Sequence, residues 1–514
     1  MADASSKPAT RECEVAIIGA GNSGLCAAIQ LRRAGIDDFV VLEKSGGVGG
    51  TWRDNTYPGA ACDVPSMFYS FSFEVNTEWS RQYAQQPEIL DYLERCADKY
   101  GVRDHIRFDT DVRQASFDEA SGRWRIETAD GEVVSARILI NGTGQLNRPF
   151  IPEIPGRAAF RGTSFHSARW NHEHDLRGER VGVIGNGASA IQFIPEIAPE
   201  VAELCIFQRS ANWVVPRKDR PYTGFEKWLF KHLPIVPWLQ RLSIWLKLEM
   251  RWPAFARPGS LVARLSEWAS LRHMRKQVED PALYPALTPD YPLGCKRILI
   301  SDDYYPALNR DNVHVVTDRI DRITDDGILT RDGSERKLDT IIFATGFRST
   351  EFLAPMRVYG REGKSLADAW GRGAEAYLGV TLPGFPNFFM LYGPNTNLGH
   401  NSIIFMIERQ VEYVLQCIRA IRARDLKYLE LRPEVMERWR EEARTSLGKT
   451  VWATSCQSWY KTEDGKITNN WPYSTTTYWL RMRHARLDEY YQVAGETGDA
   501  PGRPAGGAQA AGVA

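Results

Sequence analysis

The 514-residue chain contains 64 Lys and Arg residues and 64 Asp and Glu residues, so its formal net charge is zero. This balance gives no indication of a nucleic-acid partner, and the lack of an apolar run of about 18 residues predicts no transmembrane helix. The eight Cys residues form no CxxC pair, so we expect no metal site, no disulfide framework and reduced thiols in a cytoplasmic protein.

The first predicted element is a strand, turn, helix and strand between residues 13 and 43. Its apolar run is followed by Gly19, Gly21 and Gly24 in the pattern GxGxxG, and its second strand, 39–42, ends at Glu43. In a dinucleotide fingerprint the glycines admit the pyrophosphate and pack helix on strand, and the acid accepts from a ribose hydroxyl. Because a carboxylate repels a 2′-phosphate, this unit predicts bound FAD or NAD.

The same unit is repeated from residue 180 onward, with a base in place of the acid. Its turn is formed by Gly185, Gly187, Ser189 and Ala190. Arg209 and Ser210 follow the second strand, where Arg209 suits a 2′-phosphate through charge-assisted hydrogen bonds. A solvated Arg at a strand end is the alternative interpretation, but the shared offset from the glycine turn favours NADPH.

Two further apolar strands each end in a Thr-Gly turn. The turns are Thr143–Gly144 and Thr345–Gly346, which we expect to close the two nucleotide domains. The sequence thus predicts an α/β fold with two Rossmann-like dinucleotide-binding domains, for FAD and NADPH.

The expected boundaries make the FAD domain discontinuous. Residues 1–11 and the Gly/Ala/Pro-rich tail are expected to be disordered. The expected ranges are 12–145 and 350–492 for the FAD domain, 146–349 for the NADPH domain and 493–514 for the tail.

A segment of the NADPH domain, about 217–292, is predicted to be a helical insertion. An amphipathic pattern there places Leu239, Leu242, Leu246 and Met250 on one face, and Gln240, Ser243, Lys247 and Arg251 on another. Trp and basic residues beside such a pattern are typical of a membrane surface. A packed helical subdomain that covers the substrate pocket explains the same pattern.

The segment that leads into the second unit carries the most specific motif. Phe160, Gly162, His166 and Trp170 fit FxGxxxHxxxW, and the chain here resembles the flavin-dependent monooxygenases that include Baeyer–Villiger enzymes. That group continues with Pro or Asp where this chain has Asn171, and related N- and S-oxygenating enzymes have an aromatic residue and Lys. The resemblance implies a structural and coordinating role for His166 and Trp170.

Other segments extend this resemblance along the chain. "GGTWRDNTYPGAACD" resembles a second motif of the group and includes Gly50, Trp52 and Asp63. The resemblance implies that all three lie at the flavin and that Asp63 orients a catalytic Arg.

Three segments nearer the C-terminus resemble active-site regions of the same group. "LGCKRILISDDYYPAL" resembles the segment with the active-site Arg, which implies Arg297 as catalytic and Lys296 at the NADPH phosphate. "YGPNTNLGHNS", with Asn395, resembles the loop that meets the flavin ring, and "SWY" implies Trp459 at the substrate pocket.

The resemblance implies an FAD- and NADPH-dependent enzyme that uses O2 and a small-molecule ketone. It would form an ester or lactone through a flavin peroxide, beside which Arg297 would supply positive charge. An N- or S-oxygenating monooxygenase is the alternative, which Arg297 and the Trp170–Asn171 pair disfavour. A third hypothesis is a peripheral membrane or partner-binding protein with only residual oxidase activity; the resemblance favours the packed helical subdomain instead.

Overall fold

The structure, a computed structural model, describes residues 10–495 of the chain. Residues 1–9 and 496–514, which form most of the two segments expected to be disordered, lie outside the described residues. Where those expectations extend into the described range they are wrong, because β1 (Thr10–Ile18) and β20 (Tyr490–Ala494) are strands. Each of these strands is hydrogen-bonded to a neighbouring strand, which orders the chain there.

The first large sheet has eight strands in the order β17-β4-β5-β6-β1-β2-β3, with β18 also paired to β6. Besides β1, its strands are β2 (Phe39–Leu42), β3 (Ile106–Arg107), β4 (Val112–Asp118), β5 (Arg123–Thr128), β6 (Val133–Asn141), β17 (Arg357–Tyr359) and β18 (Phe388–Met390). The strand predicted over 39–42 is confirmed as β2, which lies parallel to β1. The sheet therefore combines strands from distant parts of the sequence.

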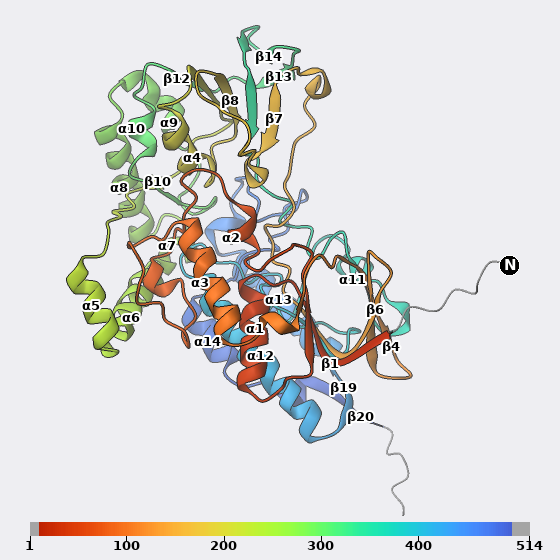
Figure 1. The fold of residues 1–514 in the computed structure, drawn as a ribbon. Coiled ribbons are helices and arrows are strands. Elements are labelled where there is room, and N and C mark those ends of the chain that lie inside the picture. Colours follow the sequence, from red (N-terminus) through yellow and green to blue (C-terminus); the bar gives the residue numbers. More distant parts are fainter. Residues whose placement is uncertain (1–9, 496–514) are drawn as a thin grey trace, which may run out of the picture.

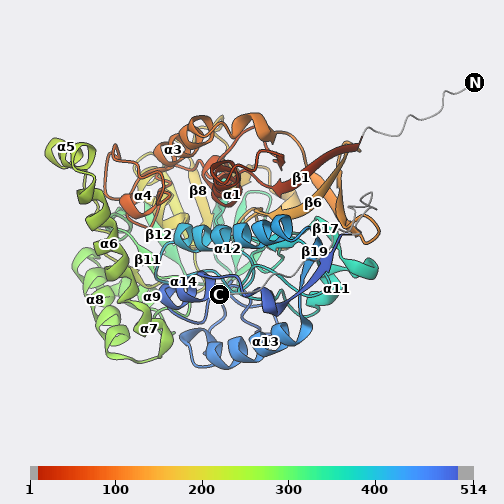
Figure 2. The same ribbon diagram turned by 90° about the horizontal axis from the view of Figure 1, so that it is seen from below.

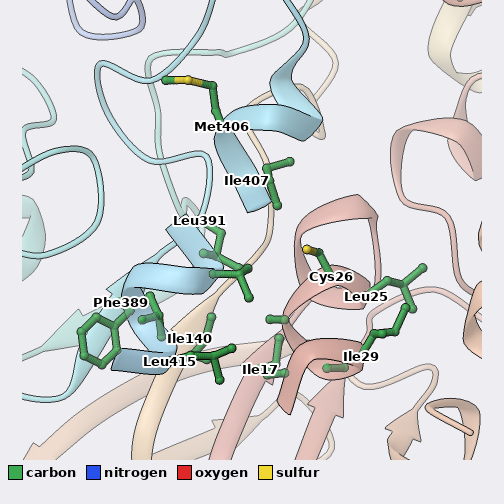
Figure 3. Close-up of a cluster of buried hydrophobic side chains, with 14 of the residues drawn as sticks. Ile17, Leu25, Cys26, Ile29, Ile140, Phe389, Leu391, Met406, Ile407 and Leu415 are labelled. Carbon is green, nitrogen blue, oxygen red and sulfur yellow. The ribbon is translucent and has the colours of Figure 1, made fainter. Parts of the chain in front are cut away.

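Both faces of this sheet are buried, as its continuous apolar strands require. Alternate residues of β1 belong to two different hydrophobic clusters. Val15 and Ile17 belong to the first cluster, and Ala16 and Ile18 belong to the second. Figure 3 shows the first cluster, where side chains of α1 (Asn22–Arg33) and α12 (Ile403–Ala423) meet those of β1, β6 and β18. This packing fixes the glycine turn between β1 and α1.

The second large sheet is parallel throughout, in the order β12-β9-β8-β16-β7. Its strands are β7 (Thr163–His166), β8 (Arg180–Ile184), β9 (Glu203–Phe207), β12 (Val313–Val316) and β16 (Thr340–Phe343). Helix α4 (Ala190–Ile197) connects β8 to β9 and packs against α10 (Tyr304–Ala307). A small antiparallel sheet follows, formed by β13 (Ile320–Ile323), β14 (Gly327–Thr330) and β15 (Glu335–Lys337).

The two large sheets lie in separate lobes (Figure 1). β1, β4 and β6 belong to one lobe, and β7, β8 and β12 to the other. Each lobe contains a strand, glycine turn, helix and parallel strand in the predicted order. The α/β fold with two Rossmann-like units is thus confirmed.

A group of helices lies between β10 (Val214–Val215) and β11 (Leu299–Ile300), within the segment predicted to be helical. Its members are α5 (Gly224–His232), α6 (Ile235–Glu249), α7 (Trp252–Ala256), α8 (Leu261–Gln277) and α9 (Tyr284–Leu287). α5, α6 and α8 lie at one end of the molecule in both views (Figures 1 and 2). Over residues 10–495 we find no helix with the length and apolar character that crossing a bilayer would require.

Helix α6 differs from the expected packed helix in the direction of its apolar face. Leu239, Leu242 and Leu246 are exposed, at 51%, 37% and 47%, and Met250, just beyond the helix, is 66% exposed. The expectation that this stripe packs inside a helical subdomain is therefore wrong. The polar residues line the cavity described below, together with Ile244 and Leu248 of the same helix.

The C-terminal part of the chain returns to the first lobe. Its elements are α11 (Leu366–Trp370), β19 (Leu426–Leu431), α13 (Pro433–Leu447) and α14 (Thr475–Met482). Two further helices, α2 (Thr51–Asp54) and α3 (Gln86–Lys99), lie earlier in the chain.

Cys295 and Cys456 form a disulfide across 161 residues, with their Cα atoms 6.4 Å apart. The expectation of eight reduced thiols is wrong for this pair, which only the folded chain brings together.

Candidate active site

A cavity of about 2300 Å³ is lined by residues of both glycine turns. Gly19 and Gly21 line it from the first unit, and Gly185 and Gly187 from the second. A pocket for one drug-sized ligand is commonly about 300–1000 Å³. The cavity therefore has room for more than one large ligand at the junction of the two units.

The first glycine turn presents the N-terminus of α1 to this cavity. Gly21 is the N-cap residue, no side chain caps the helix, and its first turn contains no acidic residue. Gly19 has a φ of 95°, and a Cβ added at Gly24 would lie 1.7 Å from the carbonyl oxygen of Gly19. Gly24 thus permits close packing behind the turn, while unpaired N–H groups and the helix dipole favour a pyrophosphate in front of it.

Glu43, at the end of β2, is buried at the cavity wall and only 5% exposed. One carboxylate oxygen accepts a hydrogen bond from the Ala20 amide at 2.6 Å, and the other accepts from the Ser45 amide at 2.8 Å. These bonds hold the carboxylate in place, and its remaining lone pairs suit a ribose hydroxyl.

Other groups around the first unit also fit FAD. Gly50 lies against the first turn, since an added Cβ would be 3.1 Å from the Cα atom of Gly21, and Trp52 donates to the hydroxyl of Tyr69 at 3.0 Å. Asn22 and Thr143 line the cavity, and each has a buried side-chain oxygen with no protein partner among the described residues. A polar ligand here would satisfy these oxygens.

The second glycine turn repeats the arrangement at α4. Gly185 has a φ of 107°, Ser189 is the N-cap residue without a side-chain cap bond, and Ala190 is buried as the first residue of the helix. Apart from its two chain neighbours, no residue of the described range 10–495 has an atom within 4 Å of the position that a Cβ would take at Gly187. The turn thus leaves open space for a second pyrophosphate beside a helix N-terminus.

Three groups that suit a phosphate converge beyond this turn. Arg209 is exposed at the end of β9, and Lys296 donates to the hydroxyl of Ser210 at 2.7 Å. The Lys296 ammonium also lies 4.4 Å from the centre of the Tyr291 ring. Burial lowers the pKa of Lys296, and the nearby Arg209 lowers it further. A 2′-phosphate would relieve this repulsion, so the group fits NADPH.

Arg297 and Asp63, which lie 234 residues apart in the sequence, meet at the cavity wall. An Arg297 Nη2–H donates to Asp63 Oδ2 at 2.8 Å. Burial alone would lower the pKa of the Arg297 guanidinium. The attraction of the Asp63 carboxylate is larger than this effect of burial, so the pKa of Arg297 is raised above its ordinary value. Arg297 is 41% exposed although it is enclosed by other groups, because it faces the cavity. A fixed positive charge therefore faces the space between the two units.

Gln192 of α4 is a site residue that the motifs did not indicate. Its side-chain Nε2 donates to Asp63 Oδ1 at 3.3 Å and to the Ala61 carbonyl at 3.1 Å, while its Oε1 accepts from Tyr57 at 3.0 Å. Gly59 permits this contact, since an added Cβ would lie 2.6 Å from the Gln192 carbonyl oxygen. The carboxylate that holds Arg297 is thus attached to the second unit as well.

His166 and Trp170 of the linker motif are not at the cavity wall, although Ser167 and Arg169 between them line it. Trp170 packs between Phe165 and Phe193, with ring centres 5.2 Å away in each case. His166 is 4% exposed, its Nδ1 accepts from the Ala168 amide at 3.1 Å, and burial lowers its pKa to about 4. These contacts suit a structural role for both residues.

The other two motif residues allow close packing at the edge of the second sheet. Phe160 lies against a buried cluster there, and a Cβ at Gly162 would lie 2.2 Å from the carbonyl oxygen of Asp339. The linker thus follows the sheet closely.

Most of the remaining predicted residues line the cavity, but Asn395 does not. Thr143–Gly144, Thr345–Gly346 and Trp459 line the cavity, and the Trp459 carbonyl accepts from Ser349 at 2.8 Å. The amide of Asn395 instead donates to the carbonyls of Ile467 and Asn470, at 2.9 and 3.2 Å, and its side chain is not at the cavity wall. Asn397 and Leu398 of the same loop reach the cavity.

Comparison with known proteins agrees with this geometry. Residues 12–356 match the model of a family described as FMO-like, flavin-binding monooxygenase-like. A Baeyer-Villiger monooxygenase of Pseudomonas aeruginosa is 44% identical over 485 residues, covering 94% of this chain and 92% of the relative.

Two solved structures are similar across nearly the whole chain. Cyclohexanone monooxygenase from Rhodococcus sp. Phi1 bound to NADP+ has a TM-score of 0.86 at 28% identity, covering 95% of this chain and 100% of the other. OTEMO in complex with FAD and NADP has a TM-score of 0.83 at 31% identity, and the match covers 92% of this chain and 97% of the other. The chain therefore belongs to the flavin-binding monooxygenase family and is, within it, a Baeyer–Villiger monooxygenase that depends on FAD and NADPH.

Proposed function

We propose that this enzyme oxygenates a small apolar ketone at Arg297, with Asp63 and Gln192 holding the guanidinium in position. The observation that carries the proposal is the 2.8 Å bond between Arg297 and Asp63 at the wall of a cavity shared by both nucleotide units. When bound, FAD reduced by NADPH supplies activated oxygen derived from O2. The roles of the protein's own groups follow from their charge and placement.

Arg297 is suited to stabilise the ketone oxygen as that oxygen gains negative charge. Its guanidinium is always protonated and presents several N–H donors in a fixed plane, of which one Nη2–H is taken by Asp63. The other donors remain available to the cavity. A charge placed before the reaction needs no rearrangement during it, and such groups contribute several kcal/mol, about 10²–10³ in rate.

Asp63 and Gln192 act as positioning residues in this proposal. Asp63 belongs to the expected FAD domain, whereas Arg297 and Gln192, from which it accepts, both belong to the expected NADPH domain, so this carboxylate joins the two units. Movement of one unit relative to the other would change the contact between the Asp63 carboxylate and Arg297. The requirement for NADPH, an intracellular reductant, supports a cytoplasmic site of action.

The function is tested by product analysis with labelled oxygen. We would incubate the purified yellow protein with NADPH, ¹⁸O2 and a panel of cyclic, linear and aryl ketones, together with a thioether. We expect an ester or lactone that carries one ¹⁸O atom. A sulfoxide as the main product, with no ester from any ketone, would favour the N- or S-oxygenating alternative and contradict the proposal.

A further inference from the structure

The outer surface of the helical insertion concentrates exposed apolar side chains. Of the sixteen large hydrophobic side chains exposed within residues 10–495, twelve lie between Phe225 and Trp268. They belong to α5, α6, α8 and the turns beside them, which lie together at one end of the molecule (Figures 1 and 2). We call this surface the insertion face. Large exposed apolar patches are uncommon on monomeric proteins and indicate interaction sites.

The insertion face is built from ordered helical stripes rather than scattered residues. On α8, Leu261, Leu265 and Trp268 follow one another at helical spacing and are 71%, 56% and 58% exposed. On α5, Phe225 and Trp228 are 68% and 52% exposed. Residues three or four apart share one face of a helix, so each helix presents a continuous apolar strip outward.

Helix α6 shows most clearly how this apolar strip is placed relative to the cavity. Its residues Gln240, Ser243 and Lys247 line the cavity, while Leu242 and Leu246 point away from it. A helix on the surface of a soluble protein normally turns its apolar side inward. On α6 apolar residues occupy both sides: Ile244 and Leu248 face inward and line the cavity, while the outward residues leave apolar area in contact with solvent unless something covers it.

The charge around the insertion face identifies the kind of surface that would cover it. Between residues 224 and 277 the sequence has ten Lys and Arg residues but only three Glu residues and no Asp, whereas the whole chain is balanced. Three of the ten cations face inward: Arg241 donates to the Met67 carbonyl, and Lys247 and Arg251 line the cavity. The Glu residues have partners: Glu226 binds Arg220, Glu249 accepts from Thr475, and Glu267 accepts from the Leu293 amide. The insertion is therefore a basic region with an apolar outer face.

We propose that the insertion face docks onto an anionic lipid bilayer. Helices with Trp and Leu on one side and Lys and Arg beside them lie in the plane of a membrane interface, where Trp rings favour the headgroup level. Anionic headgroups complement the excess of positive charge, at about 1 kcal/mol or fivefold in partitioning for each cation near the surface. A second copy of this chain would bring two equally basic faces together, which like-charge repulsion opposes.

Docking in this way would place the bilayer on the outer side of a helix whose inner side forms the cavity wall. An apolar ketone dissolved in the bilayer would then be concentrated beside the cavity. This substrate preference rests on the proposed function, but the docking itself does not, since it depends only on α5, α6 and α8. A binding assay without substrate therefore tests the docking alone.

The first experiment compares two kinds of vesicle with the purified, FAD-loaded full chain. One is made of phosphatidylcholine, the other of equal parts phosphatidylcholine and phosphatidylglycerol. We expect the protein to float with the anionic vesicles and to stay largely in solution with the neutral ones. We also expect binding to weaken at high salt, because salt screens the attraction of exposed charges. Protein that remains in solution with both kinds of vesicle would overturn the proposal.

Three exposed Trp residues provide the decisive variant. The triple change Trp228→Ser, Trp238→Ser and Trp268→Ser should reduce partitioning onto anionic vesicles at least about tenfold, since it removes apolar area from three helices. Trp479→Ser is the matched control, because Trp479 is 38% exposed on α14, outside the insertion, and should leave binding unchanged. Equal FAD content in all three proteins would show that the variants are folded.

The basic residues supply an independent variant that keeps the apolar face intact. Arg264→Gln with Arg272→Gln should lower binding to anionic vesicles about 25-fold at low salt, at about fivefold per cation. Two results would contradict the proposal: unchanged vesicle binding by the Trp variant, or a dimer of the unmodified protein that the Trp variant abolishes while neither protein binds vesicles. The second result would assign the insertion face to a second copy.

Discussion

The two nucleotide units share one backbone plan but end their second strands in opposite environments. In the first, Glu43 is 5% exposed and both of its oxygens are hydrogen-bonded to backbone amides. In the second, Arg209 stands at the corresponding place and is exposed to solvent. The difference indicates a first unit built around a retained cofactor and a second unit that a ligand can enter and leave.

The largest effect should come from exchanging the small residues behind the two turns. A Cβ at Gly24 would lie 1.7 Å from the Gly19 carbonyl oxygen, whereas the corresponding Ala190 already has a buried Cβ. We expect Gly24→Ala to separate α1 from β1 and yield a colourless or unfolded protein. Ala190→Gly should keep FAD and lose only about 1 kcal/mol of stability. Flavin absorbance per protein and thermal unfolding measure both, and a yellow, stable Gly24→Ala variant would refute this account of the turn.

Substitution of Glu43 should have a smaller effect on the first unit. Glu43→Ala leaves the buried amide of Ala20 and the partly buried amide of Ser45 without an acceptor, at about 1–3 kcal/mol for the buried group. We expect a clear fall in the free energy of unfolding together with FAD release. Glu43→Gln keeps one acceptor oxygen, so its free energy of unfolding should lie between those of the unmodified protein and Glu43→Ala. Urea unfolding would decide, and equal stability of the Ala and Gln variants would speak against the buried-carboxylate role.

Arg209 tests the second unit without disturbing the first. Loss of a charge-assisted contact costs about 1.5–3 kcal/mol, so Arg209→Ala should raise KM for NADPH roughly ten- to a hundredfold. The KM for NADH and the FAD content should hardly change, because NADH lacks the 2′-phosphate and Arg209 is exposed. Steady-state kinetics with both reductants would show this, and a parallel rise in both KM values would place Arg209 away from the phosphate.

The smallest effect concerns the linker into the second unit and depends on pH. Burial, with a smaller contribution from the nearby Arg169, lowers the pKa of His166 from 6.5 to about 4. Between those values the unfolded chain binds a proton that the folded protein does not, so stability is lost as pH falls from about 6.5 to about 4.

We therefore expect His166→Gln to lose less stability than the unmodified protein when urea unfolding is compared at pH 7 and pH 5. His232→Gln, on the exposed surface of α5, serves as the control and should follow the unmodified protein. An identical pH dependence in all three proteins would show that His166 is not the buried neutral group described here.

Local chemistry explains which features the sequence predicted correctly. The glycine turns, the strand over 39–42 and the positions of Glu43 and Arg209 follow from spacing over a few residues, and the structure has them in the expected places. Arg297 and Asp63 are 234 residues apart, so only the resemblance to known enzymes indicated them. Their contact depends on how the two units pack, which no local pattern encodes.

Other features could not be predicted because they depend on orientation or on distant partners. The periodicity of α6 separated two faces, but it did not show that Gln240 and Lys247 face the cavity while Leu242 faces solvent. Gln192 is a single polar residue on a short helix and carries no motif, so only the folded structure reveals its bond to Asp63.

The central claim, that Arg297 serves the oxygen-transfer step rather than the fold, is tested most directly by rapid-mixing kinetics of Arg297→Ala. We expect this variant to bind FAD and to be reduced by NADPH at nearly the normal rate. Ester formation should fall about 10²–10³-fold, with the NADPH consumed appearing as hydrogen peroxide. Normal ester formation by a stable Arg297→Ala variant, or loss of FAD with unchanged turnover per folded site, would contradict the claim.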